Sequence, residues 1–206
     1  MIFLFSLEEG AFLVRLARSA VAKYITESGK IVSSTAPSKR MNEKTGVFVT
    51  IETISKGERA LRGCIGYPLP YMPLVEATID SAISAAVNDP RFEPLKPEEL
   101  SEVVFEVSIL TPPNLLRPKN PRDYPRLIKV GRDGLVIESG YYKGLLLPQV
   151  PVEYGWDEET FLSECCMKAG LPPDSWLSRE VKVYTFSAEV FTEVQPGGEV
   201  EPKKLY

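Results

Sequence analysis

Two side chains capable of chemistry, a guanidinium and a thiol, lie two residues apart in the hexapeptide LRGCIG at Leu61–Gly66. Residues i and i+2 of a strand point to the same face, so Arg62 and Cys64 are expected to lie side by side. An arginine lowers the pKa of a nearby thiol, and its planar fork also binds carboxylates and phosphates. The hexapeptide is therefore a candidate for thiol chemistry or for recognition of an anionic group.

Two interpretations of the hexapeptide remain open. In the first, Arg62 pairs with a carboxylate of the protein, Cys64 is a small buried hydrophobe, and Gly63 and Gly66 permit tight packing. In the second, the glycines let a ligand or another backbone approach the strand, and Arg62 binds that ligand. A nucleophilic Cys64 would need an activating base, which the hexapeptide does not supply.

Composition excludes several classes of site. The 206 residues include no histidine, which removes Cys-His and Ser-His nucleophile activation and every imidazole-dependent metal site. Three cysteines, of which only Cys165 and Cys166 are close in sequence, do not form a disulfide framework, so a cytoplasmic protein without a metal site is expected. A net charge of −4 argues against nucleic-acid binding, and no segment is apolar enough to predict a membrane span.

Periodicity predicts the elements that must position the hexapeptide. Ser6 and Glu9 have capping-box spacing before an apolar helical stripe. A hairpin is predicted from residues 46–53 and 60–66, followed by a helix from Pro73 to about Asn88 and a strand at 103–110.

The second half of the chain has a different pattern. Five prolines between residues 112 and 125 predict a stiff crossing segment. Three short apolar runs follow at 127–130, 135–139 and 145–147. A helix capped by Asp157 and ended by Gly170 comes next, and then a long strand at 181–191. This order predicts an α+β fold with a larger subdomain, residues 1–111 plus 181–206, and a smaller inserted one, residues 112–180, containing a three-stranded antiparallel sheet.

Four sequence blocks resemble the AMMECR-domain family: LRGCIG, DPRFEPL (89–95), GLLLPQVPVEYGW (144–156) and FLSECCMKAGLPPDSW (161–176). The resemblance covers nearly the whole chain and implies two α+β subdomains joined by two connections, with the hexapeptide lining a cleft between them. It implies no established activity. It does suggest a shared pathway with Memo-type and radical-SAM proteins.

Four further residues are candidates for the cleft. Arg91 would add a second cation, although it can equally brace the loop around Pro90 by pairing with Asp89. The other three, Gln149, Glu153 and Trp156, belong to the third block. Glu153 could face Arg62, and a carboxylate paired with arginine stays ionised and is a poor general acid. Trp156 can instead anchor the small subdomain.

The sequence thus favours a protein that binds a peptide, a partner protein or a modified small molecule in the cleft, with no cofactor of its own. The alternative is an enzyme that uses Cys64 or a glutamate, with a cofactor supplied by a partner. An exposed Cys64 with a lowered pKa would favour the enzyme.

Overall fold

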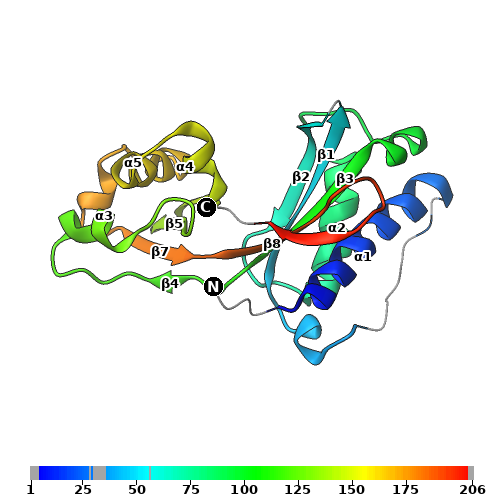
Figure 1. Ribbon diagram of the computed structural model, residues 1–206. Helices are drawn as coiled ribbons and strands as arrows, with labels where there is room; N and C mark the ends of the chain where they lie inside the picture. Colours follow the sequence, from blue (N-terminus) through cyan, green and yellow to red (C-terminus); the bar gives the residue numbers. More distant parts are fainter. Residues whose placement is uncertain (1–4, 28, 30–35, 56, 204–206) are drawn as a thin grey trace. The chain divides into compact units, whose positions relative to one another are not determined.

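A computed structural model describes residues 5–27, 29, 36–55 and 57–203 of the chain. They form two compact units, each with its own sheet and core (Figure 1). The first unit runs to Leu110 and resumes at Glu189, and the second is Thr111–Ala188. Helices with two antiparallel sheets of five and four strands make the fold α+β, which confirms the predicted fold class.

The first unit is built on the sheet β2-β1-β3-β8-β9. Its elements in chain order are α1 (Leu7–Glu27), the 3₁₀ helix η1 (Lys39–Asn42), β1 (Gly46–Ser55), β2 (Glu58–Tyr67), α2 (Leu74–Val87), η2 (Pro97–Ser101), β3 (Val103–Leu110), β8 (Ala188–Glu193) and β9 (Val200–Lys203). The predicted hairpin, the helix after Pro73 and the strand at 103–110 are confirmed. The capping box is confirmed too, since Ser6 N donates to Glu9 Oε2 at 2.8 Å and Glu9 N donates to Ser6 Oγ at 3.2 Å.

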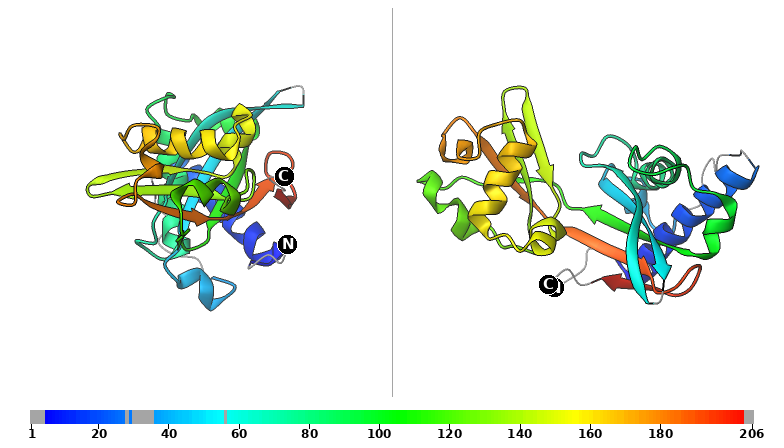
Figure 2. Two further views of the ribbon diagram at one scale, coloured as in Figure 1. Left: turned by 90° about the vertical axis from the view of Figure 1, so that its left-hand side faces the viewer. Right: turned by 90° about the horizontal axis from the view of Figure 1, so that it is seen from above.

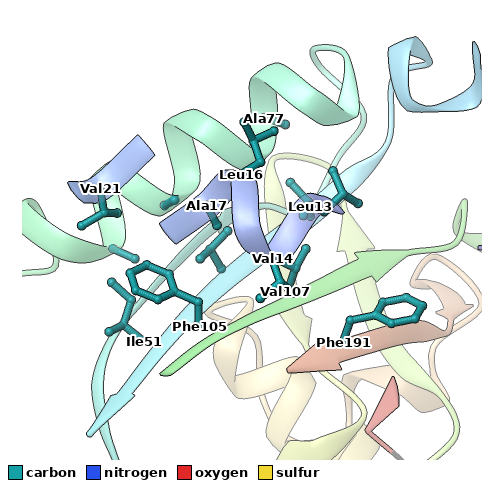
Figure 3. Packing of buried hydrophobic residues seen from close by; sticks show 14 of the residues in the cluster. Leu13, Val14, Leu16, Ala17, Val21, Ile51, Ala77, Phe105, Val107 and Phe191 are labelled. Carbon is teal, nitrogen blue, oxygen red and sulfur yellow. The ribbon is translucent and has the colours of Figure 1, made fainter. Parts of the chain in front are cut away.

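Helices α1 and α2 pack against each other and against the sheet of this unit (Figure 2). The core of this unit consists of small and branched side chains from α1 and α2 and of branched and aromatic ones from the strands, among them Ile51 and Phe105 (Figure 3). Phe191 of β8 lies so close to α1 that a Cβ on Gly10 would come within 2.2 Å of its ring. The lack of a side chain at Gly10 therefore sets how closely α1 approaches the sheet.

A buried ion pair between Arg18 and Glu193 joins β8 to α1 and β3. Arg18 donates to Glu193 from Nε and Nη2 at 2.6 Å each, and to the carbonyl oxygens of Leu100 and Val103. Glu193 also accepts a hydrogen bond from the Phe105 amide at 3.0 Å. With only 2% of the Glu193 side chain exposed, the carboxylate is satisfied almost wholly by protein donors.

The second unit has a four-stranded sheet, β4-β7-β5-β6. Its elements are β4 (Asn114–Leu115), η3 (Pro121–Asp123), α3 (Tyr124–Leu127), β5 (Gly134–Ser139), β6 (Tyr142–Leu146), α4 (Gln149–Tyr154), α5 (Glu158–Lys168), η4 (Ser175–Leu177) and β7 (Lys182–Phe186). Helix α5 packs on β5 and β6 and buries Cys165 and Cys166 in the core of this unit. The close contact depends on Gly144, whose Cβ would lie 2.5 Å from Ala169 N.

Both ends of α5 are capped. The Asp157 carboxylate accepts from Thr160 N at 2.8 Å, which confirms the predicted N-cap. At the other end Gly170 adopts φ of +80°, its amide donates to Met167 O, and the next amide donates to Cys166 O. These two bonds form a Schellman motif, which ends the helix at the predicted glycine.

Two features of the predicted small sheet are wrong. The sheet has four strands instead of three, and residues 127–130 are the end of α3 and a turn. Pro125 fits the first turn of α3, where its missing amide costs nothing. The missing strands are β4, a two-residue edge strand inside the proline-rich segment, and β7. Proline is compatible with the flanks of such an edge strand.

The predicted strand at 181–191 is also divided. Its first part, β7, belongs to the four-stranded sheet, and its second part, β8, belongs to the five-stranded sheet. The chain therefore re-enters the first unit at Glu189 and not at Val181. At the break, Thr111 N donates to Ser187 O and Ser187 N donates to Thr111 Oγ1, both at 2.8 Å. These bonds replace ladder bonds where the strand changes sheets.

Within the described part of the chain, no helix is both long and apolar enough to cross a membrane.

We expect Glu193→Gln to lower the free energy of unfolding by about 3 kcal/mol, because it removes the counter-charge of Arg18 in a buried pair. Glu138→Gln is the matched control. The Glu138 carboxylate lies 3.6 Å from both Lys143 and Lys182 and is 31% exposed, so its loss should cost less than about 1 kcal/mol. Urea denaturation followed by circular dichroism measures both variants, and equal losses would contradict a special role for Glu193.

Candidate functional site

The hexapeptide lies on β2, the edge strand of the five-stranded sheet. One side of the strand is occupied by α2, because a Cβ on Gly63 would lie 2.1 Å from the carbonyl oxygen of Ala85. A Cβ on Gly66 would lie 2.3 Å from Val47 O of β1. Both glycines thus have packing neighbours in the protein, as the first interpretation of the hexapeptide requires.

The predicted alternation of side chains does not hold at Arg62. The register of β1 and β2 shifts between Ile51 and Glu52, and Arg62 has no partner across the ladder. Such a bulge redirects the side chain of the extra residue. The guanidinium and the thiol accordingly have different neighbours, and the cation that acts on the thiol is Arg91.

Arg62 is paired within its own unit. Its Nε donates to Glu99 Oε1 at 2.8 Å and its Nη2 donates to Glu99 Oε2 at 3.1 Å, a two-pronged pair. Glu99 also accepts from the amide of Lys96, and the hydrogen bonds from Arg62 hold the pKa of Glu99 below its usual value. Pairing of Arg62 with a carboxylate therefore does not require Glu153.

One nitrogen of the Arg62 guanidinium is left without a partner. Among the residues that the structure describes, none accepts a hydrogen bond from Nη1, although this atom is buried. Burying an unpaired donor on a charged group is unfavourable. A guanidinium with two of its three nitrogens paired and the third unpaired keeps the capacity to bind a further acceptor.

The segment after α2 covers the free edge of β2. Asp89, which is 4% exposed, accepts from Cys64 N at 2.8 Å and from Arg91 at 2.9 and 2.7 Å. The hydrogen bonds from the Arg91 side chain, with those from the backbone amides of Cys64 and Arg91, hold the pKa of Asp89 far below its usual range. Arg91 thus has the loop-bracing role considered from the sequence, while 53% of its side chain remains exposed.

An aromatic ring joins the two arginines. The guanidinium carbon of Arg62 lies 5.8 Å from the centroid of the Phe92 ring, and that of Arg91 lies 5.5 Å from it. Both distances are in the cation–π range. Arg62, Asp89, Arg91, Phe92 and Glu99, with Cys64, are hereafter called the β2 cluster.

The Cys64 thiol is not activated in this arrangement. Burial raises its pKa, and the opposing effects of a hydrogen bond from Thr50 and of the Arg91 charge are smaller. Thr50 Oγ1 lies 3.4 Å from the sulfur. A protonated thiol in such surroundings is a weak nucleophile.

The same row of the sheet contains a second unusual group. Thr50 of β1 is opposite Cys64 on one side and opposite Glu106 of β3 on the other. Glu106 is 4% exposed, and burial raises its pKa although Lys203 Nζ lies 2.7 Å from its Oε2. Sequence reasoning missed this residue, and the available signal was a single acidic side chain inside the apolar strand VVFEVSIL.

Gln149, Glu153 and Trp156 belong to the second unit. Gln149 and Glu153 lie on α4, and Trp156 stacks on Tyr154 at 5.0 Å and packs against the core of that unit. The Gln149 side-chain oxygen is buried, and within the described ranges it has no hydrogen-bond donor. Their participation in one site with Arg62 stays a prediction.

No group of three or more Cys, Asp or Glu side chains among the described residues is arranged to hold a metal ion. The β2 cluster offers two guanidinium groups and an aromatic ring, which suit an anionic or π-rich ligand better than a cation.

Comparison with known proteins assigns residues 14–191 to the family model described as AMMECR1. Protein MJ0810 of Methanocaldococcus jannaschii is 55% identical over 98% of both chains, and Protein PH0010 of Pyrococcus horikoshii is 54% identical over the full length of both. The crystal structure of uncharacterized protein PH0010 from Pyrococcus horikoshii matches with a TM-score of 0.89, covering 98% of this chain and all of that one.

We expect Cys64 to react with a thiol reagent at least about tenfold more slowly in the native protein than in the unfolded one, because burial and a raised pKa both reduce available thiolate. Tryptic peptides 63–91 and 144–168 separate Cys64 from Cys165 and Cys166, so mass spectrometry can follow each. The two buried cysteines provide an internal control for global unfolding. Fast native labelling of Cys64 alone would contradict this reading.

We expect Asp89→Asn to lower the free energy of unfolding near neutral pH by about 2 kcal/mol, the scale of hydrogen bonds to a charged group. The folded pKa of Asp89 is depressed, so the unfolded chain binds more protons as the pH falls. Its contribution is present above the ordinary aspartate pKa of about 3.9 and is lost as the pH falls towards the folded value.

The acid limb of the stability curve should therefore be shallower in Asp89→Asn than in the unaltered chain. Asp123→Asn is the control, since that carboxylate is 43% exposed and 3.8 Å from Arg126. Denaturation midpoints measured across the acid range test both, and an unchanged slope in Asp89→Asn would refute the assignment.

Proposed function

The chain belongs to the AMMECR1 family, and from that premise and the geometry of the β2 cluster we propose that it is a binding protein. Its ligand would be a peptide, a partner protein or a modified small molecule that presents a carboxylate or another acceptor to Arg62. The observation that carries this proposal is the buried Nη1 of Arg62, which has no acceptor among the described residues.

The surroundings of Arg62 support recognition. Glu99 binds two of its three nitrogens and fixes the guanidinium plane, so the N–H groups of the third nitrogen have defined directions before any ligand binds. Arg91 is half-exposed and lies against the same ring, which provides an apolar platform beside two cations. Because Nη1 is buried, ligand entry on this proposal requires a movement of neighbouring side chains.

Catalysis by Cys64 is the weaker proposal, because burial raises the pKa of its thiol. One observation favours the carboxylate version of the enzyme. Glu106 has a raised pKa and is separated from Cys64 by one residue of the sheet, Thr50. A carboxylic acid with a raised pKa can act as a general acid, so a Glu106-dependent enzyme with a partner-supplied cofactor is the second candidate.

Two expectations from the resemblance stay predictions. They are a site to which Gln149, Glu153 and Trp156 contribute, and a pathway shared with Memo-type and radical-SAM proteins.

We expect Arg62→Ala to weaken ligand retention by about 10- to 100-fold, which corresponds to losing a hydrogen bond to a charged group. Native mass spectrometry after mild isolation from the source cells compares the bound fraction in the unaltered chain and the variant. Arg62→Lys keeps the charge but loses the planar fork, and should also weaken retention. Arg126→Ala removes an arginine that is 85% exposed and should leave retention unchanged.

Cys64→Ser and Glu106→Gln complete the test. On the binding proposal Cys64→Ser has a mild effect, since the thiol only packs and accepts one hydrogen bond from Thr50. Circular dichroism establishes that each variant is folded. The contrary outcome is that the unaltered chain converts the retained ligand to a product, whereas one of these variants still binds the ligand but no longer converts it. That result would mean that the protein is an enzyme.

A further inference from the structure

The second unit contains a cavity of about 330 Å³ that the β2 cluster does not involve. It lies between the segment that leaves β4, the start of η3 and α3, and the segment that enters β7. Four of its lining residues are cations, namely Arg117, Lys119, Arg179 and Lys182, and none is acidic. The chain as a whole has a net charge of −4, so this concentration of positive charge is local.

The topology of the unit explains how these distant residues meet. Leu115 of β4 pairs with Tyr184 of β7, and Leu116 N donates to Val183 O at 2.9 Å. This pairing places the residues that follow β4 beside those that precede β7. Pro118 and Pro121 then restrict the backbone of the loop, so the cavity wall loses little freedom on binding.

Three of the four cations are available. Lys182 Nζ lies 3.6 Å from Glu138 Oε1, whereas Arg117, Lys119 and Arg179 form no ion pair with any described residue. Positive charges that line one cavity repel one another and raise the local concentration of anions. An anion in the cavity would remove that repulsion.

The rest of the lining is apolar, with one hydroxyl. Leu115 and Val181 are among the apolar side chains, and Tyr124 is only 7% exposed. Burial raises the pKa of the Tyr124 phenol, so its hydroxyl keeps its proton. The cavity therefore combines donors for an anionic group with walls that suit an apolar body.

We propose that this cavity binds a small phosphorylated molecule, with the phosphate held by Arg117, Lys119 and Arg179 and the remainder against the apolar wall. A phosphate monoester carries a charge of about −1.5 to −2 at neutral pH and three acceptor oxygens, which matches several cations better than one carboxylate does. Arginine and lysine are the usual phosphate ligands. The volume is at the lower end of small-molecule sites, which range from about 300 to 1,000 Å³.

Phenyl phosphate is the probe, measured by calorimetry on the full chain at fixed low ionic strength. It should bind about tenfold more tightly than inorganic phosphate, because the ring gains apolar contacts, and about tenfold more tightly than benzoate, which has one charge. Arg179→Gln and Lys119→Gln should each weaken its binding by about tenfold or more. Both residues are exposed, so the variants should remain folded, which thermal melts verify.

Arg126→Gln is the matched control, because it removes one exposed positive charge from the same unit outside the cavity lining. Its affinity for phenyl phosphate should stay within about twofold of the unaltered chain. An equal loss in all three variants would mean charge attraction without a site, and no binding of phenyl phosphate would refute the proposal outright. A single-stranded oligothymidylate that binds more tightly than phenyl phosphate and competes with it would overturn the proposal, because the cavity would then be part of a nucleic-acid-binding surface.

Discussion

The contact between Gly63 and the backbone of α2 is the constraint on which the β2 cluster depends. Any side chain at position 63 would meet the carbonyl oxygen of Ala85, so α2 can lie against the edge strand only if that residue is glycine. The end of α2 fixes where the next segment starts, and that segment brings Asp89 to the amide of Cys64. Asp89 in turn holds Arg91, and Phe92 follows against Arg62.

The electrostatics of this cluster oppose simple acid–base chemistry. Its two carboxylates have lowered pKa values because each is bound by an arginine, so both stay ionised near neutral pH. Its thiol has a raised pKa and stays protonated. Groups in these states favour recognition over proton transfer. The exception in this sheet is Glu106, because burial raises the pKa of its carboxyl group.

Local sequence patterns predicted local structure well. The capping box at Ser6 and Glu9, the N-cap at Asp157 and the glycine stop at Gly170 each depend on residues a few positions apart. The strand at 103–110 is predicted for the same reason, since apolar and branched residues dominate the short run VVFEVSIL.

Features set by distant residues were predicted poorly. The bulge at Arg62 redirected a side chain that simple alternation would have placed beside Cys64, and Glu99 lies 37 residues from the arginine it binds. The division of the last strand at Ser187 depends on hydrogen bonds with Thr111, 76 residues away. The cationic cavity brings together segments around Arg117 and Arg179 that have no sequence signature in common.

The order of the two units along the chain has a consequence for synthesis. Thr111–Ala188 is one continuous stretch, so on a ribosome the second unit is complete before β8 and β9 exist. The first unit closes only when Glu193 reaches Arg18, across a separation of 175 residues. Contacts so distant in sequence form slowly because a long loop must close first. Before β8 is made, β3 has a pairing partner on one side only, which leaves an open strand edge in the first 110 residues.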